Sequence, residues 1–384
     1  MDELSSTNLA PPRALTPVAP QQRMLLLDVL RGFALFGVLW SNLNDWYGTT
    51  EAVTGLQRAL AWTQAGLIEQ RFYTLLGLLF GMGFAIQLTR AEQRGADVRG
   101  MFCRRMLVLL GIGVVHGLLF GHDVLTQYAL IGFLLLPFRR LSPRRLLVAA
   151  AATLVLGGLA VALTLRVSGF QFIARTPDRE LVSIYTQGDL AQIVAQNARN
   201  YLWYYRNWLF VFLPEFLTLF LLGMWAVRVN LLQRLIARRR LLVWILLGSV
   251  AVRIVGVLFT NLSVVVAYAA GLTLLVSYTG WARRLEPLAA VGRMPLTTYL
   301  TQSIISAGLF YHWGFGLYGR VGFDGMLGIA VIVFALQMAA SVWWLRRYRF
   351  GPMEWLWRSV AYAAAQPMRQ EALNLTRPTA CRLP

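Results

Sequence analysis

Long apolar runs separated by short arginine clusters limit what this chain can fold into more than any other feature of its sequence. A helix of about 20 apolar residues spans the hydrocarbon core of a bilayer. Of the 384 residues, 57% are hydrophobic and 14% are charged, whereas about 25% of an ordinary soluble domain is charged. The sequence therefore predicts an all-α integral membrane protein, a polytopic bundle of about ten transmembrane helices. The expected spans are 25–44, 72–88, 106–120, 124–138, 146–165, 208–227, 241–259, 262–278, 295–310 and 326–345.

The arginine positions predict how these spans are oriented. The net charge is +19, and the chain contains arginine but no lysine. The arginines cluster after alternate spans, and such clusters stay on the cytoplasmic side of a membrane. We therefore expect both termini in the cytoplasm. Because membrane topology accounts for the positive charge, we expect the lipid bilayer, and no nucleic acid, as a partner.

Composition divides the chain into three parts. Residues 1–22 are rich in proline and small polar residues, which predicts a disordered N-terminal tail. Residues 23–363 form the expected transmembrane helical domain, and residues 364–384 a cytoplasmic C-terminal tail. Within the domain, residues 168–207 are the largest extracytoplasmic segment, and the helical apolar rhythm of 190–205 predicts an interfacial helix there.

The first expected span carries Asp28 and Arg31 near one end and Asn42 near the other. A charged residue inside an apolar span is costly and usually has a partner and a function. At about 100° per residue, Arg31 and Asn42 fall within about 20° of the same helix face. Guanidinium groups suit phosphates, so Asp28, Arg31 and Arg293 are candidates for holding an anionic cofactor. The alternative is a headgroup-level ion pair that only anchors the helix.

All three histidines, His116, His122 and His312, fall in the layer expected at the outer side of the membrane. Histidine titrates near neutral pH and is therefore the natural general base. His116 lies deepest, inside the apolar run IGVVHGLLF, and the alternative is a core histidine hydrogen-bonded between helices. Asp123 is expected to orient His116 only if the chain turns between them, as Gly121 permits. No metal site is predicted, because the histidines lack close ligand spacing.

Arg253 lies midway along an expected span, where an unpaired charge costs roughly 3 kcal/mol on insertion scales. A partner is therefore required, and the candidates are Glu215 and Gln302. Gln302 belongs to a polar stripe with Thr298 and Ser306, which helix packing also explains. The candidate substrate-binding residues are Arg71, Glu215, Arg253, Gln302 and Tyr299.

Five segments are distinctive, in this order: LDVLRGFALFGVLWSNL, the RR-x10-H-G run that contains His116, HDVLTQYALIG, GRMPLTTYLTQS and FGPMEWLWRSVAYA. Together they resemble the YeiB-like family of bacterial membrane proteins (domain of unknown function 418), from about Arg23 to Ala363. The first segment also resembles the wider transmembrane acyltransferase superfamily. These resemblances imply a multi-pass protein of the bacterial inner (plasma) membrane. They also imply an acyl-CoA or acetyl-CoA donor at the cytoplasmic side and a glycan or lipid acceptor.

The resemblance to glycan acyltransferases fails at one position. Their first helix carries an arginine, matched here by Arg31, and a histidine where this chain has Asn42. Asparagine has no group that titrates near neutral pH, so a base must come from elsewhere, and His116 is the candidate. In this interpretation Asn42 positions the acceptor, while His116 and Asp123 supply the base and its orienter.

Three classes of function are therefore expected. The first is an integral membrane acyltransferase that moves an acyl group, with acetyl the expected one, from cytoplasmic acyl-CoA to a sugar or lipid hydroxyl or amine at the outer side. The second is a transporter or permease for a small anionic metabolite, with Arg253 and Arg31 as substrate charges. The third is a non-catalytic membrane scaffold. A homodimer is compatible with each.

Overall fold

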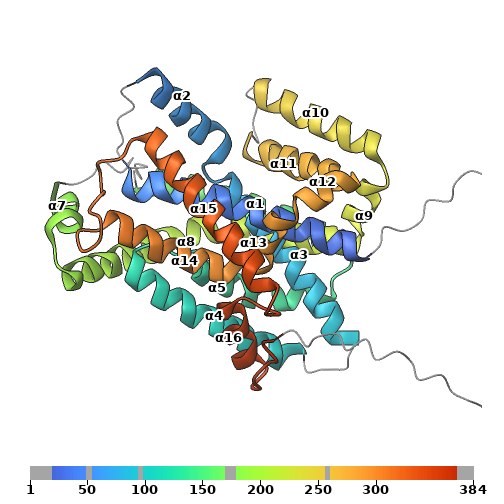
Figure 1. Ribbon diagram of the computed structural model, residues 1–384. Helices are drawn as coiled ribbons and strands as arrows, with labels where there is room; N and C mark the ends of the chain where they lie inside the picture. Colours follow the sequence, from blue (N-terminus) through green and yellow to red (C-terminus); the bar gives the residue numbers. More distant parts are fainter. Residues whose placement is uncertain (1–19, 49–53, 94–97, 169–178, 256–259, 370–384) are drawn as a thin grey trace, which may run out of the picture.

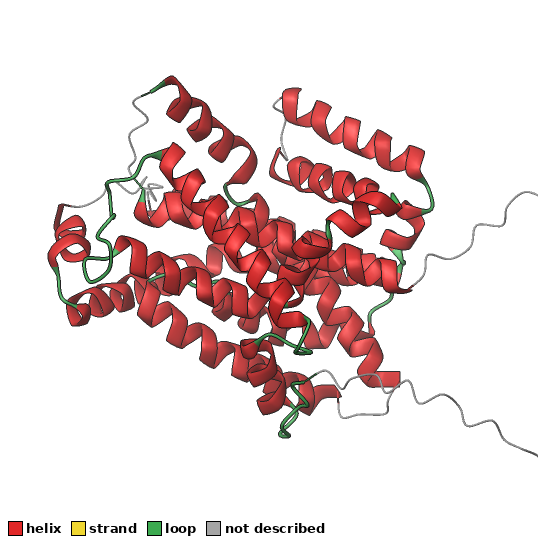
Figure 2. Ribbon diagram, in the orientation of Figure 1, coloured by secondary structure: helices red, strands yellow, loops and turns green. Residues whose placement is uncertain are grey.

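The computed structural model describes residues 20–48, 54–93, 98–168, 179–255 and 260–369, which are almost entirely helical (Figures 1 and 2). The expected N-terminal tail lies outside these residues up to position 19, and the C-terminal tail from position 370. The helices are α1 Pro20–Tyr47, α2 Gly55–Thr63, η1 Gln64–Ile68, α3 Arg71–Gln93, α4 Val98–Phe120, α5 Leu125–Leu135, η2 Leu136–Arg140, α6 Pro143–Ser168, α7 Arg179–Gln187, α8 Leu190–Arg228, α9 Leu231–Ile236, α10 Arg239–Val255, α11 Thr260–Val276, α12 Thr279–Arg284, α13 Glu286–Arg293, α14 Pro295–Phe310, α15 Phe323–Leu345 and α16 Pro352–Ala361.

Five helical stretches among the described residues are long and apolar enough to cross a membrane. They are Leu25–Tyr47, Gly55–Arg90, Arg99–Phe120, Pro143–Leu163 and Phe323–Leu345. Helices also occupy the other expected spans, but α5, α10, α11 and α14 contain 11, 17, 17 and 16 residues. They are shorter than the roughly 20 residues that span a bilayer without bundle partners.

The outward face of α6 supports a membrane environment. Val148, Leu156, Leu159 and Leu163 on this helix are each more than 60% exposed. A continuous apolar surface of this kind is rare on soluble monomers, because exposing it to water is unfavourable. The helices therefore present to their surroundings the surface that lipid requires.

The helix expected at 190–205 does not form a separate interfacial element. Leu190–Arg228 is one 39-residue helix that passes through Pro214. Asp189 caps its start by accepting a hydrogen bond from the backbone N–H of Gln192 at 2.8 Å. One continuous helix thus joins the expected interfacial segment to the sixth expected span.

Helix α1 lies at the centre of the bundle and is buried along most of its length. It packs against α3, α11, α13, α14 and α15. Its contact with α13 is unusually close, because a Cβ atom at Gly292 would lie 1.8 Å from the carbonyl oxygen of Asp28. A Cβ atom at Gly32 would lie 2.1 Å from the carbonyl oxygen of Leu288. Two glycines therefore set the distance between these helices.

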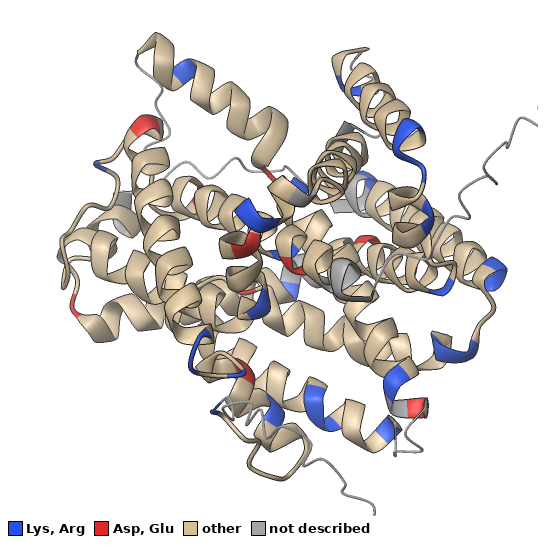
Figure 3. Cartoon of the chain, turned by 45° about the vertical axis from the view of Figure 1, so that its right-hand side comes forward, with Lys and Arg blue, Asp and Glu red and all other residues tan. Residues whose placement is uncertain are grey.

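The two ends of the bundle differ in charge. We call the end where α1 begins and α3 ends the arginine-rich end, and the other the opposite end. Arginines crowd one side of the molecule and are sparse on the other (Figure 3). Helices α10 and α11 lie side by side at one edge, and α16 packs against α4 at another (Figure 1).

Gly292→Ala should destabilise the protein, because the added methyl group forces α13 away from α1. Overpacking of this kind typically costs about 1–3 kcal/mol. The matched control is Gly248→Ala on α10, where a Cβ atom meets nothing within 4 Å. Thermal unfolding in detergent should show a clear loss for the first variant and no loss for the second. Equal melting temperatures would contradict the close contact.

Candidate functional site

Two cavities meet at Tyr299 on α14. The first, the arginine cavity, has a volume of about 400 Å³ and contains Arg31, Arg105, Arg293, Arg349 and Arg358 in its wall. The second, the acidic cavity, has a volume of about 660 Å³, and its wall contains the carboxylates of Asp45, Glu69, Asp123 and Glu215. Tyr299 and Val124 line both cavities. The molecule thus places sites of opposite charge on either side of one tyrosine.

The arginine cavity brings together Asp28, Arg31 and Arg293, the residues expected to hold an anionic cofactor. Arg31 Nη1 donates a hydrogen bond to Asp28 Oδ1 at 3.0 Å. Their spacing along α1 places them on adjacent turns, as the sequence predicts. Asp28 balances part of the charge of Arg31, so Arg31 is not an uncompensated cation.

Arg105 is the most buried arginine of this cavity, with 3% of its surface exposed. Its guanidinium stacks on Trp357 at 4.2 Å, and Trp357 Nε1 donates to the Arg105 carbonyl at 2.8 Å. Among the residues that the structure describes, none forms a hydrogen bond with the Nε atom of Arg105. A buried donor without a partner is costly, so an anion in this cavity would satisfy it. Arg105 was not in the predicted set, although it is the second arginine of the RR-x10-H-G run.

Glu354 on α16 fixes the start of α14. Its Oε1 accepts hydrogen bonds from the backbone N–H groups of Leu296 at 2.6 Å and Thr297 at 3.0 Å, and its Oε2 accepts one from the Thr297 hydroxyl at 2.5 Å. Burial raises the pKa of the Glu354 carboxyl, and these hydrogen bonds oppose that rise. A carboxylate at a helix N-terminus also interacts favourably with the helix dipole. The two C-terminal motifs of the sequence are therefore in direct contact.

His116 is held at both ring nitrogens. Its Nδ1 lies 3.0 Å from Asp123 Oδ1, and its Nε2 lies 2.8 Å from Ser303 Oγ on α14. Gly121 has a φ of +79°, a left-handed conformation that favours glycine, and it ends α4 so that the chain turns back. The turn that the sequence required between His116 and Asp123 is therefore present. Asp123 Oδ2 also accepts the backbone N–H of Thr126 at 2.6 Å, which fixes the carboxylate at the start of α5.

This arrangement can move a proton. With Nδ1–H donating to Asp123, the Nε2 lone pair is left to accept the hydroxyl proton of Ser303. The side chains of His116 and Asp123 are both buried, with 2% and 0% of their surface exposed. The His116 ring also contacts the Tyr299 ring, with centroids 5.0 Å apart. A hydroxyl, an imidazole and a carboxylate linked in this order are the arrangement that draws a proton from a hydroxyl group.

Ser303 was missed because the sequence drew attention to another face of the same helix. The stripe of Thr298, Gln302 and Ser306 recurs every four residues, but Tyr299 and Ser303 form a second pair at the same spacing. Gln302 instead lies between helices, where its Nε2 donates to Gln337 Oε1 at 3.1 Å. The contact with His116 is thus made by Ser303, on the helix face beside the Thr298, Gln302 and Ser306 stripe.

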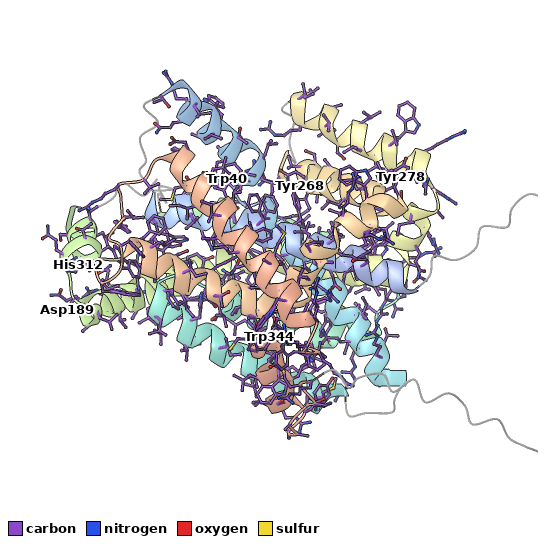
Figure 4. All side chains as sticks on the ribbon, viewed as in Figure 1. Trp40, Asp189, Tyr268, Tyr278, His312 and Trp344 are labelled. Carbon is purple, nitrogen blue, oxygen red and sulfur yellow. The ribbon has the colours of Figure 1, made fainter. Side chains whose placement is uncertain are left out.

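Asn42 forms a hydrogen bond with a residue in the wall of the acidic cavity. Its Oδ1 accepts a hydrogen bond from the hydroxyl of Tyr73, which lines that cavity together with Glu215. His122 lines it as well and stacks on Trp46 at 4.4 Å. His312 is not among the described lining residues of this cavity and lies at the edge of the molecule (Figure 4), where its backbone N–H donates to the Tyr185 carbonyl at 3.0 Å.

The prediction that Glu215 or Gln302 is the partner of Arg253 was wrong. Arg253 Nε donates to the backbone carbonyl of Gly66 at 3.3 Å, not to Glu215 or Gln302. Arg71 likewise uses a backbone group, with Nη1 donating to the carbonyl of Glu69. Both arginines lie near η1, where the π-helical turn and the link after it leave carbonyl oxygens outside a regular helix. Carbonyl groups of this kind can accept guanidinium hydrogen bonds in place of a side chain, so sequence cannot identify the partner. Among the described residues Arg71 Nε has no hydrogen-bond partner.

Comparison with known proteins decides the family. The model of "Protein of unknown function (DUF418)" matches residues 194–364. YxaH of Bacillus subtilis (strain 168) is 31% identical over 93% of this chain and 99% of its own length. The chain belongs to the YeiB-like DUF418 family. YeiB of Escherichia coli (strain K12) is 28% identical over 90% of this chain and 98% of its own, and a 39.9 kDa protein of Bacillus acidopullulyticus is 28% identical over 92% and 98%.

The DUF418 match contains α14 and α16, and therefore Tyr299, Ser303 and Glu354. Arg31, His116 and Asp123 lie before it, in the part of the chain that the full-length relatives also cover. The candidate site of this DUF418 protein is therefore assembled from both halves of the chain.

Glu354→Ala should lower the melting temperature, because it leaves two N–H groups of α14 and the Thr297 hydroxyl without their acceptor. An unsatisfied buried group costs about 1–3 kcal/mol. Glu286→Ala, at an exposed position of α13, is the matched control and should lose less than half as much. A Glu354→Ala variant as stable as wild type would show that this contact does not hold α14.

Proposed function

We propose that this DUF418 protein is a membrane acyltransferase. It would transfer an acyl group, with acetyl the expected one, from acyl-CoA in the arginine cavity to a hydroxyl or amine in the acidic cavity. The observation that carries the proposal is the buried Asp123–His116–Ser303 chain, which lies against Tyr299 where the two cavities meet. A group that activates a nucleophile is needed at such a junction, since donor and acceptor approach from opposite sides.

Different residues would bind the donor and transfer the proton. Arg31, Arg105 and Arg293 would bind the donor phosphates, because guanidinium groups hold phosphates through several hydrogen bonds. The acceptor would attack the thioester carbonyl carbon, forming a C–O or C–N bond as the C–S bond breaks. The acceptor's proton would pass through the Ser303 hydroxyl to His116 Nε2 and then to the departing thiolate. Asp123 would hold the imidazole in the tautomer that accepts this proton.

The topology that fits this proposal has about ten spans, with both termini and the arginine cavity on the cytoplasmic side. The arginine-rich end supports it, because acyl-CoA is a cytoplasmic metabolite. Five of the expected spans have the length and composition to cross a membrane alone. The shorter helices would cross as packed partners within the bundle.

The topology predicts that a cysteine placed at Ala363 stays inaccessible from outside the cell. In a Cys103→Ser, Cys381→Ser background, Ala363→Cys should react with a membrane-impermeant maleimide only after permeabilisation. A cysteine at exposed Trp313, in the loop after α14 at the opposite end, should react in intact cells. Labelling of Ala363→Cys in intact cells would contradict cytoplasmic termini.

Donor binding predicts that CoA raises the melting temperature of the purified protein. At about 100 times its Kd, a ligand stabilises the folded state by about 2.7 kcal/mol. Arg31→Ala should remove most of this rise, because the variant loses a guanidinium from the cavity wall. Arg104→Ala is the control, since Arg104 is exposed and outside the cavity. Equal CoA responses in the two variants would remove Arg31 from the donor site.

Base catalysis predicts that His116→Ala abolishes transfer while the protein still folds and binds CoA. Losing a general base typically lowers the rate by about 10²–10⁴-fold. Membrane vesicles given ¹⁴C-acetyl-CoA should transfer label to an acceptor fraction with wild type and with the control His312→Ala, but not with His116→Ala. Transfer by a folded His116→Ala variant at the wild-type rate would show that His116 is a structural core histidine and not the base.

A transporter is the second candidate, because two cavities that meet at one residue also suit alternating access. The same vesicles separate the two functions. Transport moves a labelled anion into the lumen unchanged, whereas acyl transfer makes a new covalent product and releases CoA.

A further inference from the structure

We propose that the acidic cavity binds a ligand that carries an ammonium group. Four carboxylates, those of Asp45, Glu69, Asp123 and Glu215, line this cavity. No arginine is among its described lining residues, although the chain as a whole has a net charge of +19. The described part of this wall therefore carries acidic side chains and no arginine, and the field inside attracts a cation.

Two of these carboxylates interact with basic side chains outside the cavity wall. Arg71 attracts Glu69 without lining the cavity, and Arg253 lies near Arg71. Asp123 is engaged with His116. Arg71 and Arg253 offset at most two of the four negative charges, so among the described residues the wall of the cavity remains acidic. Asp45 is held in place by Ser41 Oγ at 2.8 Å and by Gln64 Nε2 at 3.2 Å, both of which donate to it.

Gln64 gives an independent indication that a hydrogen-bond donor belongs here. It is 6% exposed and lines the acidic cavity. Its Nε2 donates to Asp45, while its Oε1 has no hydrogen-bond partner within the described part of the chain. A buried amide oxygen without a donor costs free energy. An ammonium group beside Asp45 would supply both the N–H donor for Gln64 Oε1 and the positive charge for the carboxylate.

The aromatic wall favours the same ligand. Tyr73, Trp46, Trp203 and Tyr204 line the cavity together with the carboxylates. Tyr73 lies within electrostatic reach of Asp45, and Tyr204 within reach of both Asp123 and Glu215. Aromatic faces attract ammonium groups by the cation–π interaction. Carboxylates interleaved with aromatic rings are therefore a recognition surface for cationic amines.

This inference specifies the acceptor of the proposed acyl transfer, and that part of it rests on the proposed function. If acyl transfer occurs, the acceptor is an amine or an amino sugar that binds as the ammonium, gives one proton to a carboxylate of the cavity and then attacks the thioester through the freed nitrogen lone pair. The four carboxylates disfavour phosphorylated or carboxylated glycans as acceptors. Binding itself needs no donor. An assay without acyl-CoA therefore tests the inference separately from the acyltransferase proposal.

The experiment measures binding of amines to the full-length protein in a nonionic detergent, without CoA. The probes are glucosamine and spermidine, each compared with its N-acetylated form, which has a similar shape and no charge at the acetylated nitrogen. We expect at least one amine to bind about tenfold or more tightly than its N-acetylated form, which carries one positive charge fewer, the difference that about 1.4 kcal/mol produces. Binding of that cation should weaken at higher ionic strength.

Variants locate the binding site. Glu215→Gln and Asp45→Asn keep the side-chain shapes and remove one charge each, and each should weaken cation binding about tenfold. Glu286→Gln, at an exposed position outside the acidic cavity, is the control and should leave binding unchanged. The melting temperature of each variant shows whether it is folded, and two separate positions keep the test valid if one variant is unstable.

Three results would overturn the inference. The first is equal affinity for the cationic and N-acetylated probes. The second is no binding of either cation up to about 10 mM, weaker than most small-molecule sites. The third is cation binding that both Glu215→Gln and Asp45→Asn leave intact, which would place it elsewhere. Loss of acyl transfer with cation binding intact would instead count against the proposed function alone.

Discussion

The structure depends on one constraint: a polar group inside an apolar bundle is costly unless a protein group or a ligand pairs with it, because lipid supplies no partner. The Asp123–His116–Ser303 chain meets this constraint by linking α4, the turn after it and α14. Glu354 meets it at the start of α14. The same helix is thus anchored to α16 at its start and to His116 two turns later. These bonds hold Tyr299 where both cavities reach it.

Close backbone packing makes room for these polar contacts. At Gly32 and Gly292 the backbones of α1 and α13 approach until no side chain fits between them. Helices in membranes commonly associate through small residues, which allow extensive van der Waals contact. Arg31 lies one residue before Gly32, and Arg293 follows Gly292. The close contact therefore places both arginines in the wall of the same cavity.

The two cavities separate charge within one bundle. Five arginines line one and four carboxylates line the other, while Val124 and Tyr299 line both. Opposite fields of this kind favour an anionic ligand on one side and a cationic ligand on the other. Their shared wall contains the ring that packs against His116. Two cavities of opposite charge with a shared wall would suit a reaction between an anionic donor and an acceptor that binds as a cation.

The sequence by itself determined the helical class, the first helix with its Asp28–Arg31 pair, and the need for a turn between His116 and Asp123. These are local properties, since apolar length and residue spacing along one helix fix them. Only the tertiary structure decided that Ser303, 187 positions from His116, completes the chain. It also decided that Arg253 binds a backbone carbonyl and that Glu354 caps α14. Such contacts depend on the rotation and crossing of separate helices. An apolar run does not encode that rotation, because lipid accepts any apolar face.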